Sequence, residues 1–183
     1  MALLKLPINA GRLAVLVFTA PLVQSGSGQP VPEYEVKAAY LFNFVKFVAW
    51  PPESLGSPSD PLSICTLSDN PFGDALEAAL AGKTFSGRPI VSRQVNGAAQ
   101  ARACQILFVS AAAERSFRAM ASDLKGAGVL AVGESEGFLS EGGVINFKLD
   151  SGHVRLQVNI KAAEGQRLHI SAKLLSLADV VKK

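Results

Sequence analysis

The sequence predicts an α/β protein with a mostly parallel sheet flanked by helices and an antiparallel C-terminal extension. Between residues 62 and 132, short apolar runs alternate with helical patterns, which is typical of parallel strands connected by helical crossovers. After Gly133 the apolar runs are separated by loops too short for such helices, so we expect these later strands to pair antiparallel. An amphipathic stretch at residues 32–52 precedes the first strand, and we expect it to be buried against the sheet.

The stretch at residues 32–52 reads as a single buried helix that ends after Trp50. Two prolines follow Trp50 and stop the helix. Asn43 and Lys46 interrupt an apolar run already shorter than the roughly 18 residues of a membrane span, so the helix should pack against protein. Asn43, Lys46 and Trp50 follow one another at helical spacing and should share one stripe. That stripe is either a solvated edge or the wall of a site. The apolar residues that recur at helical spacing are Val36, Tyr40, Leu41, Phe44, Val45, Phe47 and Val48.

The remaining elements follow from periodicity, caps and turn residues. Strands are predicted at residues 62–67, 89–95, 105–109, 128–132, 144–148, 153–160 and 167–170. Helices are predicted at residues 71–80, 111–124 and 171–181. The helix at 71–80 should be capped by Asp69 or Asn70.

The N-terminal residues are typical of a secretory signal peptide. Two cations lead into an apolar run at residues 13–20, which small residues follow. We expect cleavage near Ser25, so that residues 1–25 are a signal peptide and residues 33–181 form a single exported domain. A transmembrane anchor is the alternative, although an apolar run of about a dozen residues is short for a span.

Charge argues against a nucleic-acid partner. The chain holds 18 basic and 15 acidic residues. Loss of Lys5 and Arg12 with the signal peptide leaves 16 basic residues against 15 acidic ones, a net charge of only +1. Binding to nucleic acid needs a concentrated basic face, and the longest run of Lys or Arg is the terminal pair.

The two cysteines are predicted to form a disulfide. Export to an oxidising compartment favours a bond between Cys65 and Cys104 over a metal site or a redox motif. A closed loop of about 39 residues would contribute roughly 4 kcal/mol in the chain-entropy model. The alternative is a pair of buried free thiols.

A cluster of polar residues in the last strands is the clearest candidate site. His153, Arg155, Gln157 and Asn159 alternate with apolar residues. If residues 162–166 form the turn of a hairpin, Arg167 and His169 approach Gln157 and Asn159 across the ladder. Such a set suits an anionic or carboxylate ligand, with Lys46 and Trp50 as further walls. An ordinary wet sheet face is the alternative.

Enzymatic function finds less support. The sequence shows none of the usual zinc, nucleophile-elbow, dinucleotide or phosphate-loop signatures, and we expect no cofactor. Ser68, Asp69, Asn70, Ser110 and residues 133–137 fall at the carboxyl ends of predicted strands, where ligands commonly bind. A hydrolase at these serines is therefore one hypothesis. Helix caps and turns explain the same residues.

Seven segments give the sequence a resemblance to the YfiR family of periplasmic regulators, and the resemblance runs from Tyr34 to Leu177. The long helix and the closing strand and helix are its specific parts. The segments are YEVKAAYLFNFVKFVAWP (34–51), PFG (71–73), GRP (87–89), CQILFV (104–109), GGVINF (142–147), VRLQVN (154–159) and LHISAKLL (168–175).

The resemblance implies an α/β, homodimeric regulator without catalysis. Such proteins repress a YfiN-like inner-membrane diguanylate cyclase by binding its periplasmic sensor region. A YfiB-like, OmpA-like lipoprotein of the outer membrane sequesters them, so that cyclic di-GMP output and biofilm formation follow. The remaining function class is a periplasmic receptor for a small anion or carboxylate that feeds a signalling kinase.

The resemblance also assigns residues. Cys65 and Cys104 match one cysteine pair of the family, while a second pair is absent from residues 137–152. Lys46 stands where the family commonly has an arginine, and a lysine does not reproduce a bidentate contact. The residues that match the family's polar pocket are Lys46, Trp50, Gln157, Arg167 and His169.

Overall fold

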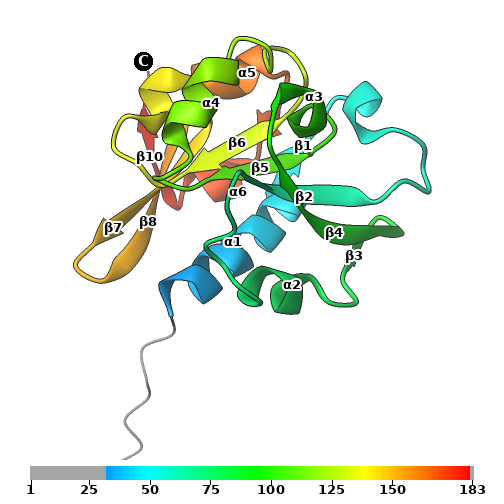
Figure 1. Ribbon diagram of the computed structural model, residues 1–183, viewed down its shortest axis with the longest axis horizontal. Coiled ribbons are helices and arrows are strands. Elements are labelled where there is room, and N and C mark those ends of the chain that lie inside the picture. The colour runs from blue at the N-terminus through cyan, green and yellow to red at the C-terminus, as the bar shows by residue number, and fades with distance from the viewer. Residues whose placement is uncertain (1–31, 182–183) are drawn as a thin grey trace, which may run out of the picture. The chain divides into compact units, whose positions relative to one another are not determined.

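The computed structural model describes residues 32–181, and the predicted signal peptide lies outside them. Within these residues one eight-stranded sheet has the order β10-β8-β7-β6-β5-β2-β4-β3 (Figure 1). The strands are β2 (Leu62–Leu67), β3 (Thr84–Phe85), β4 (Arg88–Val95), β5 (Ile106–Val109), β6 (Leu130–Gly133), β7 (Ile145–Asp150), β8 (His153–Asn159) and β10 (Ala178–Val181).

The pairing confirms the predicted fold class. Strands β4, β2, β5, β6 and β7 pair with one another in parallel, in that order across the sheet. Strands β7 and β8 pair antiparallel, as expected of the C-terminal extension. The short strand β3 pairs antiparallel with β4 at the other edge.

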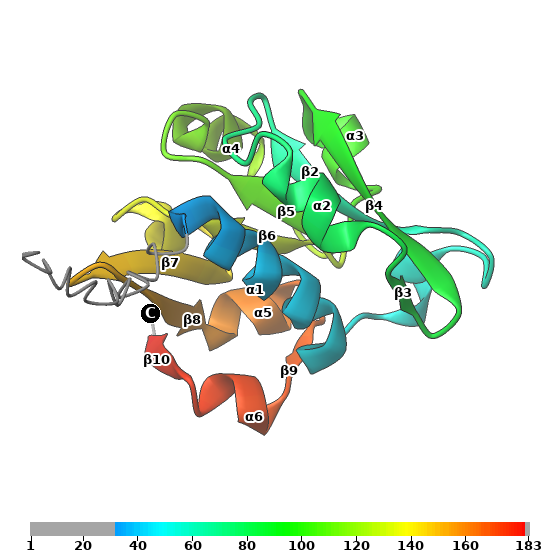
Figure 2. The same ribbon diagram turned by 90° about the horizontal axis from the view of Figure 1, so that it is seen from below.

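Helices cover both faces of the sheet (Figures 1 and 2). On one face lie α1 (Glu33–Phe47) and α2 (Ala75–Leu80), and on the other lie α3 (Ala98–Ala101) and α4 (Glu114–Met120). Alternate residues of the central strands point to opposite faces. Ile106 and Phe108 of β5 therefore join the core beneath α1, while Leu107 and Val109 join the core beneath α4. All four are fully buried, as expected of a parallel sheet covered on both sides.

Helix α1 is shorter than predicted. It ends at Phe47, because Val48 and Ala49 become strand β1 (Val48–Ala49) and pair antiparallel with β9 (His169–Ile170). The prediction that the helix continues to Trp50 is therefore wrong. Its buried face includes Leu41 and Phe44, and the Phe44 ring stacks on Phe147 of β7 at 6.0 Å between centroids.

The predicted hairpin of residues 153–160 and 167–170 is also wrong. Helix α5 (Ile160–Gly165) lies between these strands, and β9 pairs with β1 rather than with β8. The closing segment differs too: α6 (Ala172–Leu175) is one turn long, and the chain then extends as β10 parallel to β8. Pairing with β8 gives the backbone of residues 178–181 its hydrogen bonds. The helical spacing of the local sequence does not indicate such a partner.

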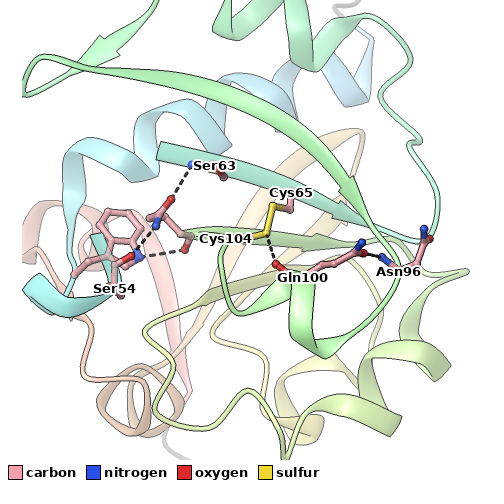
Figure 3. Close-up of a disulfide and its surroundings, with 8 residues drawn as sticks. Ser54, Ser63, Cys65, Asn96, Gln100 and Cys104 are labelled. Atoms are coloured by element: carbon pink, nitrogen blue, oxygen red, sulfur yellow. Dashed lines mark hydrogen bonds between the residues drawn. A yellow bond between two sulfur atoms is a disulfide. The ribbon is translucent and has the colours of Figure 1, made fainter. Parts of the chain in front are cut away.

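The predicted disulfide is confirmed. Cys65 of β2 is bonded to Cys104, which precedes β5, and their Cα atoms lie 6.0 Å apart (Figure 3). Both residues are buried in the core beneath α3 and α4. Among residues 32–181, the helices are all too short or too polar to cross a membrane.

Candidate functional site

A pocket of about 560 Å³ lies where α1 ends, and we call it the helix-end pocket. It is bounded by the β1–β9 ribbon, by the short 3-10 helix η1 (Pro52–Leu55) and by β3 with the start of β4. Its volume falls in the range typical of small-molecule sites. The lining residues are Lys46, Phe47, Val48, Ala49, Trp50, Leu55, Leu62, Phe85, Ser86, Arg88, His169, Ile170 and Ser171.

The helix-end pocket joins apolar walls to a cationic rim. Lys46, Arg88 and His169 are its ionisable residues, and within the described chain the lining includes no carboxylate. Two further ammonium groups lie over aromatic rings nearby: Lys83 over Phe42 and Lys173 over Phe47, the latter at 5.5 Å. This combination suits an amphipathic ligand with an apolar body and an anionic group.

Gln105 fixes the wall that Trp50 forms. The indole Nε1 of Trp50 donates to the backbone oxygen of Gln105 at 3.0 Å. The Gln105 side chain accepts from the Ser63 N–H and donates to the Ser54 oxygen, each at 2.7 Å (Figure 3). Because Gln105 is buried and bonds through its backbone oxygen and both polar atoms of its side chain, it holds η1 and Trp50 against the sheet.

The predicted stripe of Asn43, Lys46 and Trp50 does not exist as such. Lys46 lies on the last turn of α1, where its Nζ is 3.4 Å from the Asn43 side-chain oxygen. Trp50 follows β1 outside the helix. Lys46 and Trp50 still line one pocket, because β1 turns the chain back across the end of α1.

Arg88 is a residue of the pocket that sequence reasoning did not single out. Its Nη1 donates to the backbone oxygens of Leu55, Ser57 and Asp60, at 2.9, 2.5 and 3.1 Å. Arg88 therefore fastens the loop after η1 to the start of β4. It belongs to the short GRP segment, and the only local signal was an arginine beside a turn glycine.

The structure brings together three of the six predicted ligand-binding residues. Lys46, Trp50 and His169 line the helix-end pocket. Arg167 lies on the other side of η1, where its guanidinium pairs with Glu53 and donates to the Gly126 oxygen at 2.7 Å. A backbone hydrogen bond and the Arg167 charge lower the pKa of Glu53.

Gln157 and Asn159 lie outside the helix-end pocket and away from Arg167. Asn159 is buried, accepts from the Ala162 N–H at 3.1 Å and donates to the Leu139 oxygen at 3.2 Å. It therefore caps α5, a role typical of asparagine before a helix. The Gln157 side-chain oxygen is 3.4 Å from the Asn146 Nδ2. The alternation of residues 153–159 was correct, but the cap signal at Asn159 indicates a helix in place of the expected turn.

Ser110, at the carboxyl end of β5, uses its side chain in local hydrogen bonds. Ser110 donates to Asp69 at 2.7 Å and accepts from the Ala113 N–H at 3.1 Å. Asn70 accepts from the Phe72 N–H at 3.1 Å within a turn, but α2 begins only at Ala75 and no side chain caps it, so the predicted cap by Asp69 or Asn70 is wrong. These bonds favour the structural interpretation of this edge over the hydrolase hypothesis.

A buried ion cluster at the same edge was missed. Lys37 is 4% exposed and bonds Glu134 at 2.6 Å as well as Glu33 on its own helix. The Tyr34 hydroxyl donates to Glu134 at 3.2 Å, and burial with the Glu134 charge raises the pKa of Tyr34 to about 12. The spacing of Glu33 and Lys37 predicts a helical pair, but nothing local indicates that Glu134 completes it.

Comparison with known proteins identifies one family. A model of the family described as YfiR/HmsC-like matches residues 34–179. No curated protein matches the chain.

Two solved structures are similar in fold. A conserved domain protein from Vibrio cholerae O1 biovar El Tor aligns with a TM-score of 0.56 and 14% identity, over 82% of this chain and 60% of that one. An ABC domain from Streptococcus pneumonia in complex with L-Trp aligns with a TM-score of 0.46 and 11% identity, over 80% and 60%. The chain thus spans 60% of the length of each solved chain. The Vibrio likeness shows the fold alone.

Proposed function

Because the chain belongs to the YfiR/HmsC-like family, we propose that it binds and represses the periplasmic sensor region of an inner-membrane diguanylate cyclase and so lowers cyclic di-GMP. The family is one of periplasmic regulators in cyclic di-GMP signalling. The observation that carries the proposal is the extent of the match, which covers residues 34–179 and so nearly the whole described chain.

Two features of the chain support this proposal. The N-terminal residues have the pattern of a signal peptide, and a disulfide lies in the core, as suits an oxidising compartment. On this proposal residues 1–25 are removed on export and residues 33–181 act as one domain.

The proposed activity is a protein contact rather than a chemical step. The cyclase is the direct partner, and an OmpA-like lipoprotein of the outer membrane relieves repression by sequestering the protein. The repressor acts as a homodimer.

Deletion of the coding sequence tests the proposal. Cyclic di-GMP should rise in the deletion strain. The intact sequence supplied in trans should lower it again to the level of the parent strain. A version lacking residues 1–25 is the matched control, since it should stay in the cytosol and fail to restore repression. Unchanged cyclic di-GMP on deletion would contradict the proposal.

Co-purification tests the direct contact. The tagged protein, recovered from cross-linked membranes, should retain a diguanylate cyclase that has a periplasmic segment. A cytosolic version without residues 1–25 should retain none. Recovery without any cyclase, from cells in which deletion does change cyclic di-GMP, would place the protein upstream of an intermediary.

A second candidate function is favoured by the cationic rim of the helix-end pocket. We infer that a small carboxylate with an apolar body binds there, and that the protein serves as its periplasmic receptor for a signalling kinase. Calorimetry with aromatic carboxylates should detect binding that His169→Ala weakens and Arg167→Ala leaves unchanged, because Arg167 lies outside this pocket. Equal loss in both variants, or no binding to the intact protein, would exclude the pocket.

A further inference from the structure

A second pocket, of about 580 Å³, lies on the other side of η1 from the helix-end pocket. Three arginines line it: Arg93, Arg102 and Arg167. We call it the arginine pocket. Its volume again falls in the range of small-molecule sites, but its lining differs from that of the helix-end pocket, because guanidinium and amide groups replace the aromatic walls.

The disulfide fixes the backbones of two of these arginines relative to each other. Arg93 of β4 lies directly opposite Cys65 of β2 in the parallel register. Arg102 is the C-cap residue of α3, two residues before Cys104. The bond between Cys65 and Cys104 therefore ties together the two elements that present Arg93 and Arg102. Bracing these elements lowers the part of the binding cost that comes from ordering the backbone.

Two of the guanidinium groups are also held by backbone oxygens. Arg102 donates to the Asp123 oxygen, and Arg167 donates to the Gly126 oxygen at 2.7 Å. Each guanidinium has five N–H donors, so these bonds orient the group and leave further donors free. Gly128 lies beside this region at φ +75°, and a Cβ there would meet the Ser54 side chain at 2.8 Å. Glycine thus permits η1 to pack this closely.

The charges of the arginine pocket are not balanced internally. Of its two carboxylates, Glu53 pairs with Arg167, and Asp60 accepts from the Ser57 N–H at 2.7 Å. Within residues 32–181, Arg93 forms no ion pair, and the contact of Arg102 is to a neutral carbonyl. Two guanidinium charges therefore face a pocket without a carboxylate of their own.

We propose that the arginine pocket binds a small molecule that carries two or more phosphate or carboxylate groups. The guanidinium fork matches the oxygens of both groups in a bidentate manner. The two guanidinium groups without a carboxylate partner, those of Arg93 and Arg102, come from separate elements and so suit a ligand with more than one anionic group. This site goes beyond the proposed regulatory function and does not depend on it. It differs from the helix-end pocket, whose apolar walls suit a single anionic group on an apolar body.

Calorimetry on the full-length protein tests the proposal with pyrophosphate and citrate as probes, and with acetate as a monovalent comparison. Pyrophosphate or citrate should bind with one site per chain, and acetate should not. Binding of pyrophosphate alone would indicate a site for phosphate groups, and binding of citrate alone would indicate a site for carboxylate groups. Arg93→Ala and Arg102→Ala should each weaken binding about tenfold, as expected for loss of a charge-assisted hydrogen bond.

Arg155→Ala is the matched control, because Arg155 is an exposed arginine of β8 outside the pocket. It should leave binding unchanged, and an equal loss in Arg155→Ala would reduce the effect to general charge attraction and overturn the proposal. Amide NMR shifts locate the probe without any substitution. They should centre on Ser63, Gln105 and Ala127, and shifts centred on Val48 and Ile170 would overturn the site.

The absence of binding by both polyvalent probes would also overturn the proposal. A poly-glutamate peptide is the last arm of the test. If the peptide bound through Arg93 and Arg102 while pyrophosphate and citrate did not, the pocket would be a contact for an acidic protein segment and the small-molecule proposal would be wrong.

Discussion

The two ends of helix α1 lie in opposite chemical surroundings. At its start, Lys37 is buried between Glu33 and Glu134. At its last turn, Lys46 is exposed on the rim of a pocket whose described lining has no carboxylate. Both are lysines of one amphipathic helix. The comparison teaches that a lysine becomes part of the fold where acidic partners meet it, and stays available to a ligand where they do not.

The same contrast separates the two ends of the parallel strands. At the carboxyl ends of the parallel strands, Asp69, Ser110 and Glu134 bond to other groups of the chain. Around η1 the cations of the helix-end pocket and of the arginine pocket outnumber the acids. Ligand crevices of parallel sheets commonly lie at the carboxyl ends, but here that edge is occupied by the start of α1.

Removal of Lys37 should have the largest effect. Lys37→Ala leaves the Glu134 side chain, 9% exposed, without its closest cation, and should cost about 3 kcal/mol of unfolding free energy. Denaturant unfolding measures it. Lys46→Ala is the matched control at the other end of the helix and should change stability by less than about 0.5 kcal/mol. Equal losses would end the distinction between the two lysines.

Ser110→Ala should have the next largest effect on stability. The change removes a bond to Asp69 and the acceptor of the Ala113 N–H, so we expect a loss of about 1 to 2 kcal/mol. At equal protein levels, control of cyclic di-GMP should persist. Loss of that control by a folded Ser110→Ala protein would revive the hydrolase hypothesis for this edge.

Alkaline unfolding tests the tyrosine of the buried cluster. Because burial and Glu134 raise the pKa of Tyr34 from 10.0 to about 12, the folded state holds this proton more tightly than the unfolded state. The contribution of Tyr34 is therefore complete below pH 10 and falls as the pH rises from 10 to 12. Stability measured across this range should fall less steeply for Tyr34→Phe. If stability fell equally steeply with pH in the intact protein and in Tyr34→Phe, ionisation of Tyr34 would not contribute to the stability of the cluster.

Substitution of His169 should have the smallest effect on stability. His169 is exposed, so His169→Ala should change the unfolding free energy by less than about 0.5 kcal/mol. The same variant should weaken binding of an aromatic carboxylate severalfold. A large loss of stability with unchanged binding would reverse the comparison, since His169 would then belong to the fold rather than to a ligand site.

Local pattern was sufficient for the central strands and for the disulfide. Residues 62–67 form β2 as predicted, and the predicted strand at 89–95 is β4 with one added residue, Arg88. β2 is buried along its whole length, as a short apolar run predicts. β4 is buried only in part, and its β-branched residues favour a strand. Cys65 and Cys104 were the only cysteines, and they pair.

Pattern failed where backbone pairing overrides side-chain periodicity. Val48 and Val180 both lie in segments with helical spacing, yet each is in a strand because a partner strand, β9 or β8, takes up its backbone groups. The six predicted ligand residues separated for a related reason. Asn159 starts a helix, and the helix directs Arg167 and His169 to opposite sides of η1 rather than back toward Gln157.

The sequence by itself determined the α/β class, the family, the cysteine pair and the order of the central elements, because each depends on residues close in sequence or on overall composition. Only the tertiary structure decided which charges are neutralised and which remain available. Glu134 lies 97 residues from Lys37, and Glu53 lies 114 residues from Arg167. Such pairing depends on which distant side chains the folded backbone brings together, and the periodicity of a local segment does not predict contacts with residues far away in the sequence.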